Sequence, residues 1–339
     1  MIRSGVRARP ASVLQDAADR ALAEGVIARE PRAIAKAITL IESSRRDHQA
    51  RAQALLEALL PHTGHSFRIG ITGAPGAGKS TFIEAFGLHL TACGHRVAVL
   101  AVDPTSAVSG GSILGDKTRM ERLSRDPSAF IRPSPSGGTL GGVAHKTREA
   151  LAVCEAAGYD VVIVETVGVG QSETAVAGMT DLFALLALPN AGDDLQAIKR
   201  GIVELVDVVL VNKADIDPKA AELARTQITN AFSMLRLRES WWTPPVLAVS
   251  ALTGAGLDGF WREAGRYRDT ATANGTLAAK RRRQALDWMT GIVEHDLRAR
   301  FYQHGAVKAG LAPLQKAVAE GTITPAAAAA RLLALGSGR

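Results

Sequence analysis

Cysteine and aromatic residues are scarce in this chain of 339 residues. The two cysteines, Cys93 and Cys154, lie far apart and have no neighbours at metal-ligand spacing. We therefore expect a reducing compartment and two thiols that pack as small apolar side chains. Aromatic residues form 4% of the chain, whereas hydrophobic residues of all kinds form 47%. A well-buried core built mainly from Ala, Val, Leu and Ile is expected.

Long apolar runs are also lacking. No uninterrupted apolar stretch reaches membrane-spanning length, and no signal-peptide core follows the Arg-containing start. A transit peptide stays an alternative, although Asp16, Asp19 and Glu24 soon interrupt its pattern. The formal charge is +7, with an Arg cluster at 281–283, but basic residues are not interleaved with aromatics. We expect a cytoplasmic protein with solvated basic faces or a protein partner, and neither nucleic acid nor membrane as partner.

One glycine-rich stretch carries a complete phosphate-binding pattern. It fits G-x-x-x-x-G-K-[ST] at every fixed position and reads Gly73, Ala74, Pro75, Gly76, Ala77, Gly78, Lys79 and Ser80. A strand pattern at 67–72 precedes it and helical spacing follows it, as the motif requires. Backbone N–H groups would converge on the phosphates at the positive helix end. Lys79 should reach the β- and γ-phosphates, and the Ser80 hydroxyl should bind Mg²⁺.

A second motif identifies the base. The apolar run 208–211 leads into Asn212-Lys213-Ala214-Asp215, an N-K-x-D pattern. The Asp215 carboxylate can accept from N1–H and the 2-amino group of guanine, whereas adenine would leave it unpaired. Asn212 can hold the base loop and the Lys213 stem can cover the ring. The backbone of Ser250, Ala251 and Leu252 can donate to guanine O6. We predict GTP and GDP as the ligands.

Three acidic residues at strand ends or in the following loop are candidate magnesium ligands: Asp103, Asp116 and Glu165. With Ser80 and two nucleotide phosphates, one or two of these carboxylates would complete an oxygen shell, directly or through water. A helix cap is the alternative for Asp116 and a structural role is the alternative for Glu165.

The residues that follow Glu165 indicate how the γ-phosphate is sensed and how the hydrolytic water is positioned. Glu165-Thr166-Val167-Gly168 stands where many GTPases have D-x-x-G, so the Gly168 N–H is a candidate γ-phosphate sensor. Val169 stands where Ras-like proteins have a water-orienting glutamine, which predicts weak intrinsic hydrolysis. A partner that docks on segments 106–116 and 188–199 could bring in Lys199 to stabilise charge. The predicted catalytic residues are thus Lys79, Glu165, Gly168 and Lys199.

Apolar runs alternate with helical patterns between residues 66 and 250, which is typical of a buried parallel sheet. After the strand at 67–72, strands are expected at 96–102, 160–164, 182–188, 208–211 and 246–249. Helices are expected at 143–157, 193–205 and 218–236. The pattern predicts an α/β P-loop GTPase domain with a mostly parallel sheet and helices on both faces. Glycine-rich loops at 109–112 and 136–142 are either switch elements or long connections.

Helical spacing without strand signals marks both ends of the chain, at 11–60 and at 284–301 and 311–319. We predict an N-terminal helical extension (1–63), a GTPase domain (64–265) and a C-terminal helical dimerisation region (266–339). The apolar stripe of this last region includes Leu286, Met289, Ile292 and Val293, and no strand layer is left for it to cover.

These motifs resemble the MeaB/ArgK-type GTPases over nearly the whole chain. The resemblance rests on the P-loop extended to Thr81, on Val102-Asp103-Pro104-Thr105-Ser106, on Glu165-Thr166-Val167-Gly168-Val169-Gly170-Gln171-Ser172-Glu173 and on Asn212-Lys213-Ala214-Asp215. It implies a homodimeric G-protein chaperone that protects, and helps to load with cofactor, methylmalonyl-CoA mutase or a related adenosylcobalamin-dependent acyl-CoA mutase. It also implies a third switch at 188–199, where Asn190 replaces an expected glycine. An adenosyltransferase as a further partner stays open.

Three other functions fit the sequence less well than a mutase-associated GTPase. An ATP-dependent protein kinase of the ArgK type conflicts with the guanine motif and with the lack of H-R-D and D-F-G patterns. A nickel-insertion GTPase usually needs a His- or Cys-based site, but the eight histidines are scattered. A nucleotide-independent interaction module would leave two guanine-nucleotide motifs unexplained.

Overall fold

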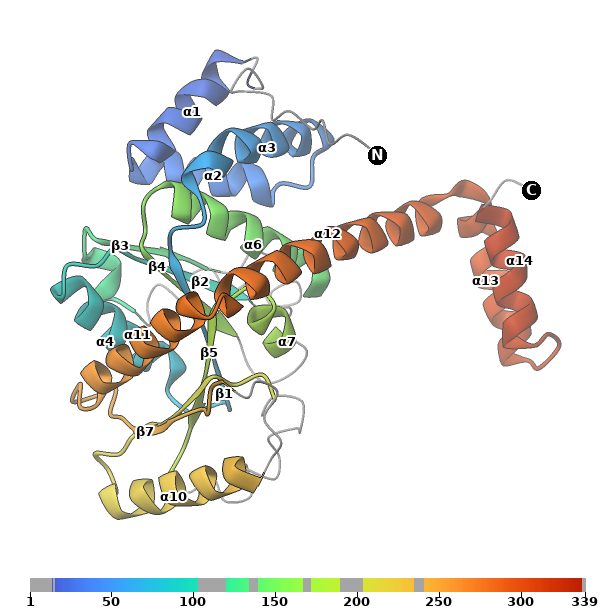
Figure 1. Cartoon of the computed structure of the whole chain (residues 1–339). Coiled ribbons are helices and arrows are strands. Elements are labelled where there is room, and N and C mark those ends of the chain that lie inside the picture. The colour runs from blue at the N-terminus through green and yellow to red at the C-terminus, as the bar shows by residue number, and fades with distance from the viewer. Residues whose placement is uncertain are drawn as a thin grey trace, which may run out of the picture. The chain divides into compact units, whose positions relative to one another are not determined.

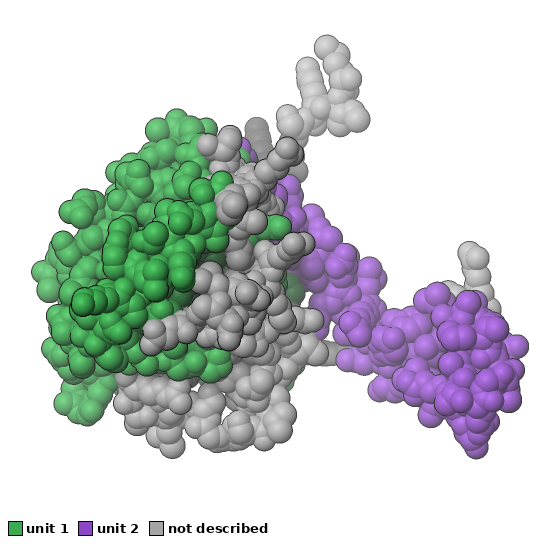
Figure 2. Space-filling model, turned by 90° about the horizontal axis from the view of Figure 1, so that it is seen from below, with its two compact units in different colours: residues 1–281 green, residues 282–339 purple. Residues whose placement is uncertain are grey.

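The computed structural model describes residues 14, 16–102, 120–133, 140–166, 172–189, 204–234 and 241–336. The chain divides into two compact units, residues 1–281 and 282–339, which Figure 2 colours green and purple. The domain boundaries expected at 63/64 and 265/266 stay predictions, because one compact unit can hold more than one domain. Among the described helices, none is long and apolar enough to cross a membrane.

The first unit is built on a seven-stranded, all-parallel sheet (Figure 1). The strands in spatial order are β3 (Ala129–Arg132), β2 (Val97–Val102), β4 (Val161–Thr166), β1 (Phe67–Gly73), β5 (Leu182–Ala187), β6 (Val208–Val211) and β7 (Val246–Ala248). Because every strand runs in the same direction, their carboxyl ends meet at one edge of the sheet. The predicted α/β class is therefore confirmed.

Alternate residues of the strands enter two separate cores. On one face, Ile69 and Ile71 of β1 pack with Phe82 and Phe86 from helix α4 (Lys79–Ala92). Helix α11 (Leu257–Ala273) covers the same face. On the other face, the alternate strand residues, such as Val162 and Val164 of β4, pack against three other helices. Those helices are α6 (Leu140–Ala156), α7 (Ser172–Ala177) and α10 (Pro218–Met234). This double burial explains why the strands read as continuous apolar runs.

The N-terminal helices α1 (Ala17–Ile27), α2 (Pro31–Glu42) and α3 (Arg46–Leu59) pack on one another and on α6, above the sheet in Figure 1. Ile34, Ile38 and Ile41 of α2 share this core with Leu55 and Leu59 of α3, and all five are fully buried. Ion pairs add to the packing: Arg51 pairs with Asp19, and Arg132 of β3 pairs with Glu42. The N-terminal extension is thus part of the first unit rather than a free arm.

Two more segments complete the described chain. Helix α12 (Thr276–Gln303) begins in the first unit and continues into the second. The second unit also contains α13 (Gly305–Ala319) and α14 (Pro325–Gly336), joined by a short turn. Short 3₁₀ turns occur at Leu60–His62 and Leu123–Arg125.

Several details differ from the sequence predictions. Strand β3 was not predicted, because its four residues are only partly buried and give a weak apolar signal. Cys93 is exposed at the end of α4 rather than packed, whereas Cys154 is buried and burial raises the pKa of its thiol. Arg281 was expected on a solvated face but is bound to buried Asp181; Arg282 and Arg283 are exposed. Most of the helix predicted at 193–205 lies outside the described residues.

Candidate nucleotide site

The phosphate-binding loop connects β1 to α4 by a tight turn. Ala77 N–H donates to Ala74 O at 3.1 Å, and Gly78 has the left-handed φ of 86° that favours glycine. A Cβ on Gly78 would also lie 2.9 Å from Asn212 Nδ2, so two constraints require glycine there. A Cβ on Gly73 would meet the Leu186 carbonyl at 2.5 Å. The loop is thus a tight glycine-rich turn that leads into the N-terminus of α4, a backbone arrangement of the kind that binds anions.

The Lys79 ammonium lies over this loop. Its Nζ donates to Gly73 O at 2.8 Å and to Ala74 O at 3.3 Å. Burial lowers the pKa of Lys79, while the charges of Glu165 and Glu173 act in the opposite direction and favour the cation. The ammonium is thus held beside the loop by two backbone carbonyls.

Asn212 connects the base motif to the phosphate loop. Its Nδ2 donates to Ala77 O at 2.8 Å, across 135 residues of sequence, and the side chain is buried. Its Oδ1 accepts from Ala251 N–H at 3.1 Å. One amide therefore joins the P-loop, the end of β6 and the loop after β7. The sequence suggested that Asn212 holds the base loop but did not indicate the link to Ala77.

The other base residues lie at the same edge of the sheet. Lys213 has a left-handed φ of 61°, and its Cε lies 3.9 Å from the position that a Cβ on Gly78 would occupy. Ala214 N–H donates to Val249 O at 3.1 Å, which fixes the motif against the loop that contains Ser250. Asp215 and Leu252 are exposed. The structure thus brings N-K-A-D and S-A-L together, while their contacts with a base stay predictions.

Two of the proposed metal ligands are neighbours. Ser80 Oγ donates to Glu165 Oε1 at 3.4 Å, and Glu165 is buried at the end of β4. A hydroxyl and a carboxylate are hard oxygen ligands of the type that Mg²⁺ prefers, so these residues fit the ion. The remaining predicted residues, Asp103, Asp116, Gly168 and Lys199, lie outside the described residues. In the described ranges, no group of three or more His, Cys, Asp or Glu side chains could hold a metal.

Glu173 is a site residue that the sequence analysis did not single out. It begins the short helix α7 together with Ser172, is 1% exposed, and its charge favours the cationic form of Lys79. The signal was available, because Glu173 closes the segment that starts at Glu165. Without the fold, however, nothing indicated that this carboxylate lies near the P-loop lysine.

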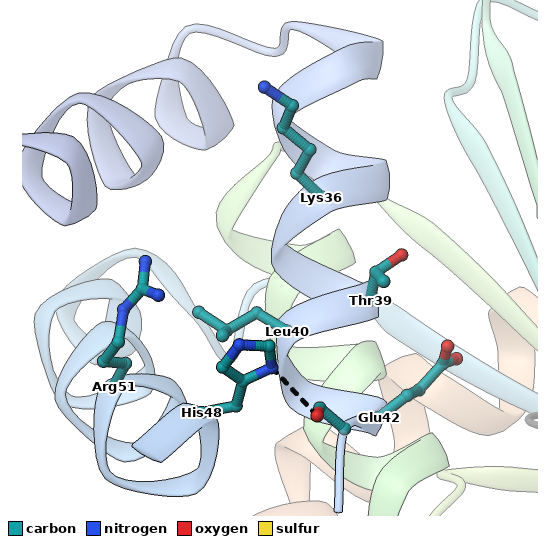
Figure 3. Close-up of a pocket in the computed structure, with 7 residues that line it drawn as sticks. Lys36, Thr39, Leu40, Glu42, His48 and Arg51 are labelled. Carbon is teal, nitrogen blue, oxygen red and sulfur yellow. Dashed lines mark hydrogen bonds between the residues drawn. The ribbon is translucent and has the colours of Figure 1, made fainter. Parts of the chain in front are cut away.

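An open groove on the N-terminal helices is a competing candidate site (Figure 3). Its volume is about 460 Å³, and it is lined by Lys36, Thr39, Leu40, Glu42, Ser43, His48 and Arg51. Most of its charges are already paired: Arg51 binds Asp19, Glu42 binds Arg132, and His48 Nδ1 is 2.9 Å from Ser43 Oγ. In Figure 3, Thr39 and Glu42 point away from His48 and Arg51. The lining does not converge on one ligand, so we assign none.

Comparisons with known proteins agree with the nucleotide site. A family model described as "Methylmalonyl Co-A mutase-associated GTPase MeaB" matches residues 34–306. The chain is 44% identical over 320 residues to the Mus musculus "Methylmalonic aciduria type A homolog, mitochondrial", covering 91% of this chain and 77% of that protein. It is 49% identical over 265 residues to "GTPase ArgK" of Escherichia coli, covering 78% of this chain and 80% of that protein.

The fold comparison points in the same direction. A crystal structure titled "LAO/AO transport system kinase" matches with a TM-score of 0.77 and 37% identity, covering 95% of this chain and 98% of that one. The chain is thus similar in fold to that structure over almost its full length.

Proposed function

Because the chain belongs to the MeaB family of methylmalonyl-CoA mutase-associated GTPases, we propose that its GTP hydrolysis serves an adenosylcobalamin-dependent acyl-CoA mutase. The predicted family resemblance is thereby confirmed, and the chain is a GTPase. The partner would be methylmalonyl-CoA mutase or a relative. The GTPase would protect this mutase and help to load its cofactor. The family match over residues 34–306 is the observation that carries the proposal.

The proposed roles of the site residues follow from their positions. The N–H groups of Ala74 and of residues 76–80, at the N-terminus of α4, bind the phosphates, and Lys79 leaves its loop carbonyls for the β- and γ-phosphates. Ser80 and Glu165, 3.4 Å apart, would hold Mg²⁺, which neutralises charge that develops on the phosphate oxygens. Asn212 keeps the base loops and the P-loop in one arrangement, so base recognition and phosphate binding occur together.

The partner is proposed to complete the catalytic site. Val169, and not a water-orienting glutamine, directly follows Gly168, so an isolated chain should hydrolyse GTP slowly. A mutase that docks on the segments 106–116 and 188–199 would position the water or bring in Lys199. Any coupling of binding is reciprocal: the factor by which a nucleotide, GTP or GDP, changes the affinity for the mutase equals the factor by which the mutase changes the affinity for that nucleotide.

The partner proposal predicts stimulated hydrolysis. Single-turnover GTP hydrolysis should accelerate on addition of an adenosylcobalamin-dependent acyl-CoA mutase, by about tenfold or more, because a docked partner supplies missing catalytic contacts. The Lys199→Ala variant reports whether that residue contributes. Equal rates with and without each candidate mutase would leave the GTPase activity intact and remove the mutase from the proposal.

The base assignment predicts a change in nucleotide preference. Asp215→Asn should weaken GTP binding and favour xanthosine triphosphate, whose ring has a carbonyl where guanine has its 2-amino group. A lost charged hydrogen bond costs about 1.5–3 kcal/mol, or roughly tenfold to a hundredfold in affinity. Competition between the two nucleotides measures it, with Asp217→Asn, an exposed residue two positions further on, as the control. An unchanged preference for GTP would show that Asp215 does not contact the base.

We also propose a homodimer through α12. Leu286, Met289, Ile292, Val293 and Leu297 are between 43% and 62% exposed. At 100° per residue, four of them fall on one stripe of the helix: Leu286, Met289, Val293 and Leu297. Such a stripe suits contact with a second copy. The double variant Leu286→Glu/Val293→Glu should sediment as a monomer at micromolar concentration. Arg298→Glu, on the opposite side of the helix, is the control. A monomeric wild type would count against the proposal.

A protein kinase is the second candidate, because the matching crystal structure carries "transport system kinase" in its title. Incubation with γ-labelled GTP and ATP distinguishes the two activities. Release of free phosphate identifies a GTPase, and label retained on a protein substrate identifies a kinase.

A further inference from the structure

A buried pair of hydroxyls lies where two strands of the site end. Thr166 Oγ1, on the last residue of β4, donates to Thr72 Oγ1 of β1 at 3.0 Å. Thr72 is 1% exposed and Thr166 is fully buried. Their sequence neighbours belong to the nucleotide site: Glu165 precedes Thr166, and Gly73, whose carbonyl accepts from Lys79, follows Thr72.

This hydrogen bond extends the pairing of the two strands. The paired residues of β1 and β4 run from Phe67–Val161 to Ile71–Glu165 and end there. The hydroxyl pair continues the connection one residue further, to the point where β1 turns into the P-loop. It therefore joins the last residue of β4 to the residue that precedes the phosphate loop.

The two threonines cannot act by touching the nucleotide. Successive side chains of a strand point to opposite faces, and Glu165 lies on the face of α4, where it contacts Ser80. Thr166 and Thr72 share the other face with Val162 and Val164, the face packed by α6 and α7. Their effect on the site must pass through the backbone.

Packing alone does not account for hydroxyls at these positions. On the adjacent strands, Val102 of β2 pairs with Thr166 and Leu185 of β5 pairs with Thr72, and valine has the shape of threonine without a polar group to bury. A hydrogen bond, unlike apolar contact, prefers one distance and direction. We infer that Thr166 is a positioning residue for GTP hydrolysis: through Thr72 it holds Glu165 in register with the P-loop.

Four variants test this role, and the test depends on GTP hydrolysis alone, whether or not a mutase is the partner. Thr166→Val should lower kcat about tenfold while the KM for GTP stays within about twofold, because the substrate still binds to an intact P-loop. Thr166→Ser keeps the hydroxyl and should retain most of the activity. Thr147→Val is the matched control, since Thr147 is a buried threonine whose hydroxyl donates to Val143 O within its own helix.

The double variant Thr72→Val/Thr166→Val separates positioning from stability. Replacing both partners with apolar groups of the same shape is close to neutral for folding. Thr166→Val alone leaves the buried Thr72 hydroxyl without its partner and should lower the urea midpoint, whereas the double variant should have the wild-type midpoint and a low kcat. The double variant also serves as the test if Thr166→Val alone fails to fold. Wild-type kcat in the double variant, an equal loss in Thr147→Val, or a Thr166→Ser variant as slow as Thr166→Val would each overturn the inference.

Discussion

Lys79→Ala is expected to remove nearly all GTP hydrolysis. The ammonium of Lys79 is held beside the P-loop, 2.8 Å from Gly73 O, and is proposed to contact the transferred phosphate. In phosphoryl transfer the protein contributes mainly position and charge, so the loss of a preorganised cation removes a large part of the catalysis. We expect a decrease in kcat of about three orders of magnitude, which single-turnover hydrolysis with excess enzyme would measure.

Two variants control this result. Lys36→Ala removes an exposed lysine from the N-terminal groove, to which no ligand is assigned, and should hydrolyse GTP at the wild-type rate. Lys79→Arg keeps the charge but changes its shape, and should recover only part of the activity. Since burial lowers the pKa of Lys79, the smaller alanine side chain removes a desolvated cation, so the fold should survive. Wild-type turnover by a folded Lys79→Ala protein would remove Lys79 from the catalytic residues.

The fold was predictable because its strands are buried on both faces. The runs 96–102 and 160–164 need no alternation to be recognised, and a parallel sheet places everything that follows its strands at one edge. That rule alone brings the P-loop, Glu165 and Asn212 together. Strand β3 was missed because it lacks this double burial. Its residues are only half buried and include Arg132, so they give no continuous apolar run.

The contacts within the site were less predictable. Asn212 reaches Ala77 across 135 residues, and the geometry of that amide depends on how β6 and the P-loop are packed. Glu173 lies near Lys79 only because α7 folds back on the sheet. Short-range patterns identify residue types and their order, whereas such pairings arise from the register of the sheet.

The contacts of Arg281 also could not be predicted from the sequence, and they affect the stability of the fold. From sequence it belonged to a basic cluster, but its guanidinium binds the amino-terminal edge of the sheet region. It donates to Asp181 Oδ1 at 2.8 Å and Oδ2 at 2.6 Å, and to the carbonyls of Gly64 and Ser66, both at 2.6 Å. Asp181 is fully buried, and its Oδ2 also accepts from Arg68 N–H. The start of α12 is thereby attached to β1 and β5.

Arg281→Ala should therefore lower the free energy of unfolding by about 3–5 kcal/mol, because it leaves the buried Asp181 carboxylate without its cation. Urea denaturation measures the change. Arg225→Ala, which breaks an exposed pair with Glu222 on α10, should leave the urea midpoint unchanged. In a double variant with Asp181→Asn the two losses should not add, since both partners belong to one interaction. A loss below about 1 kcal/mol for Arg281→Ala would mean that water or Arg68 satisfies Asp181 instead, and that the attachment of α12 rests on its apolar contacts.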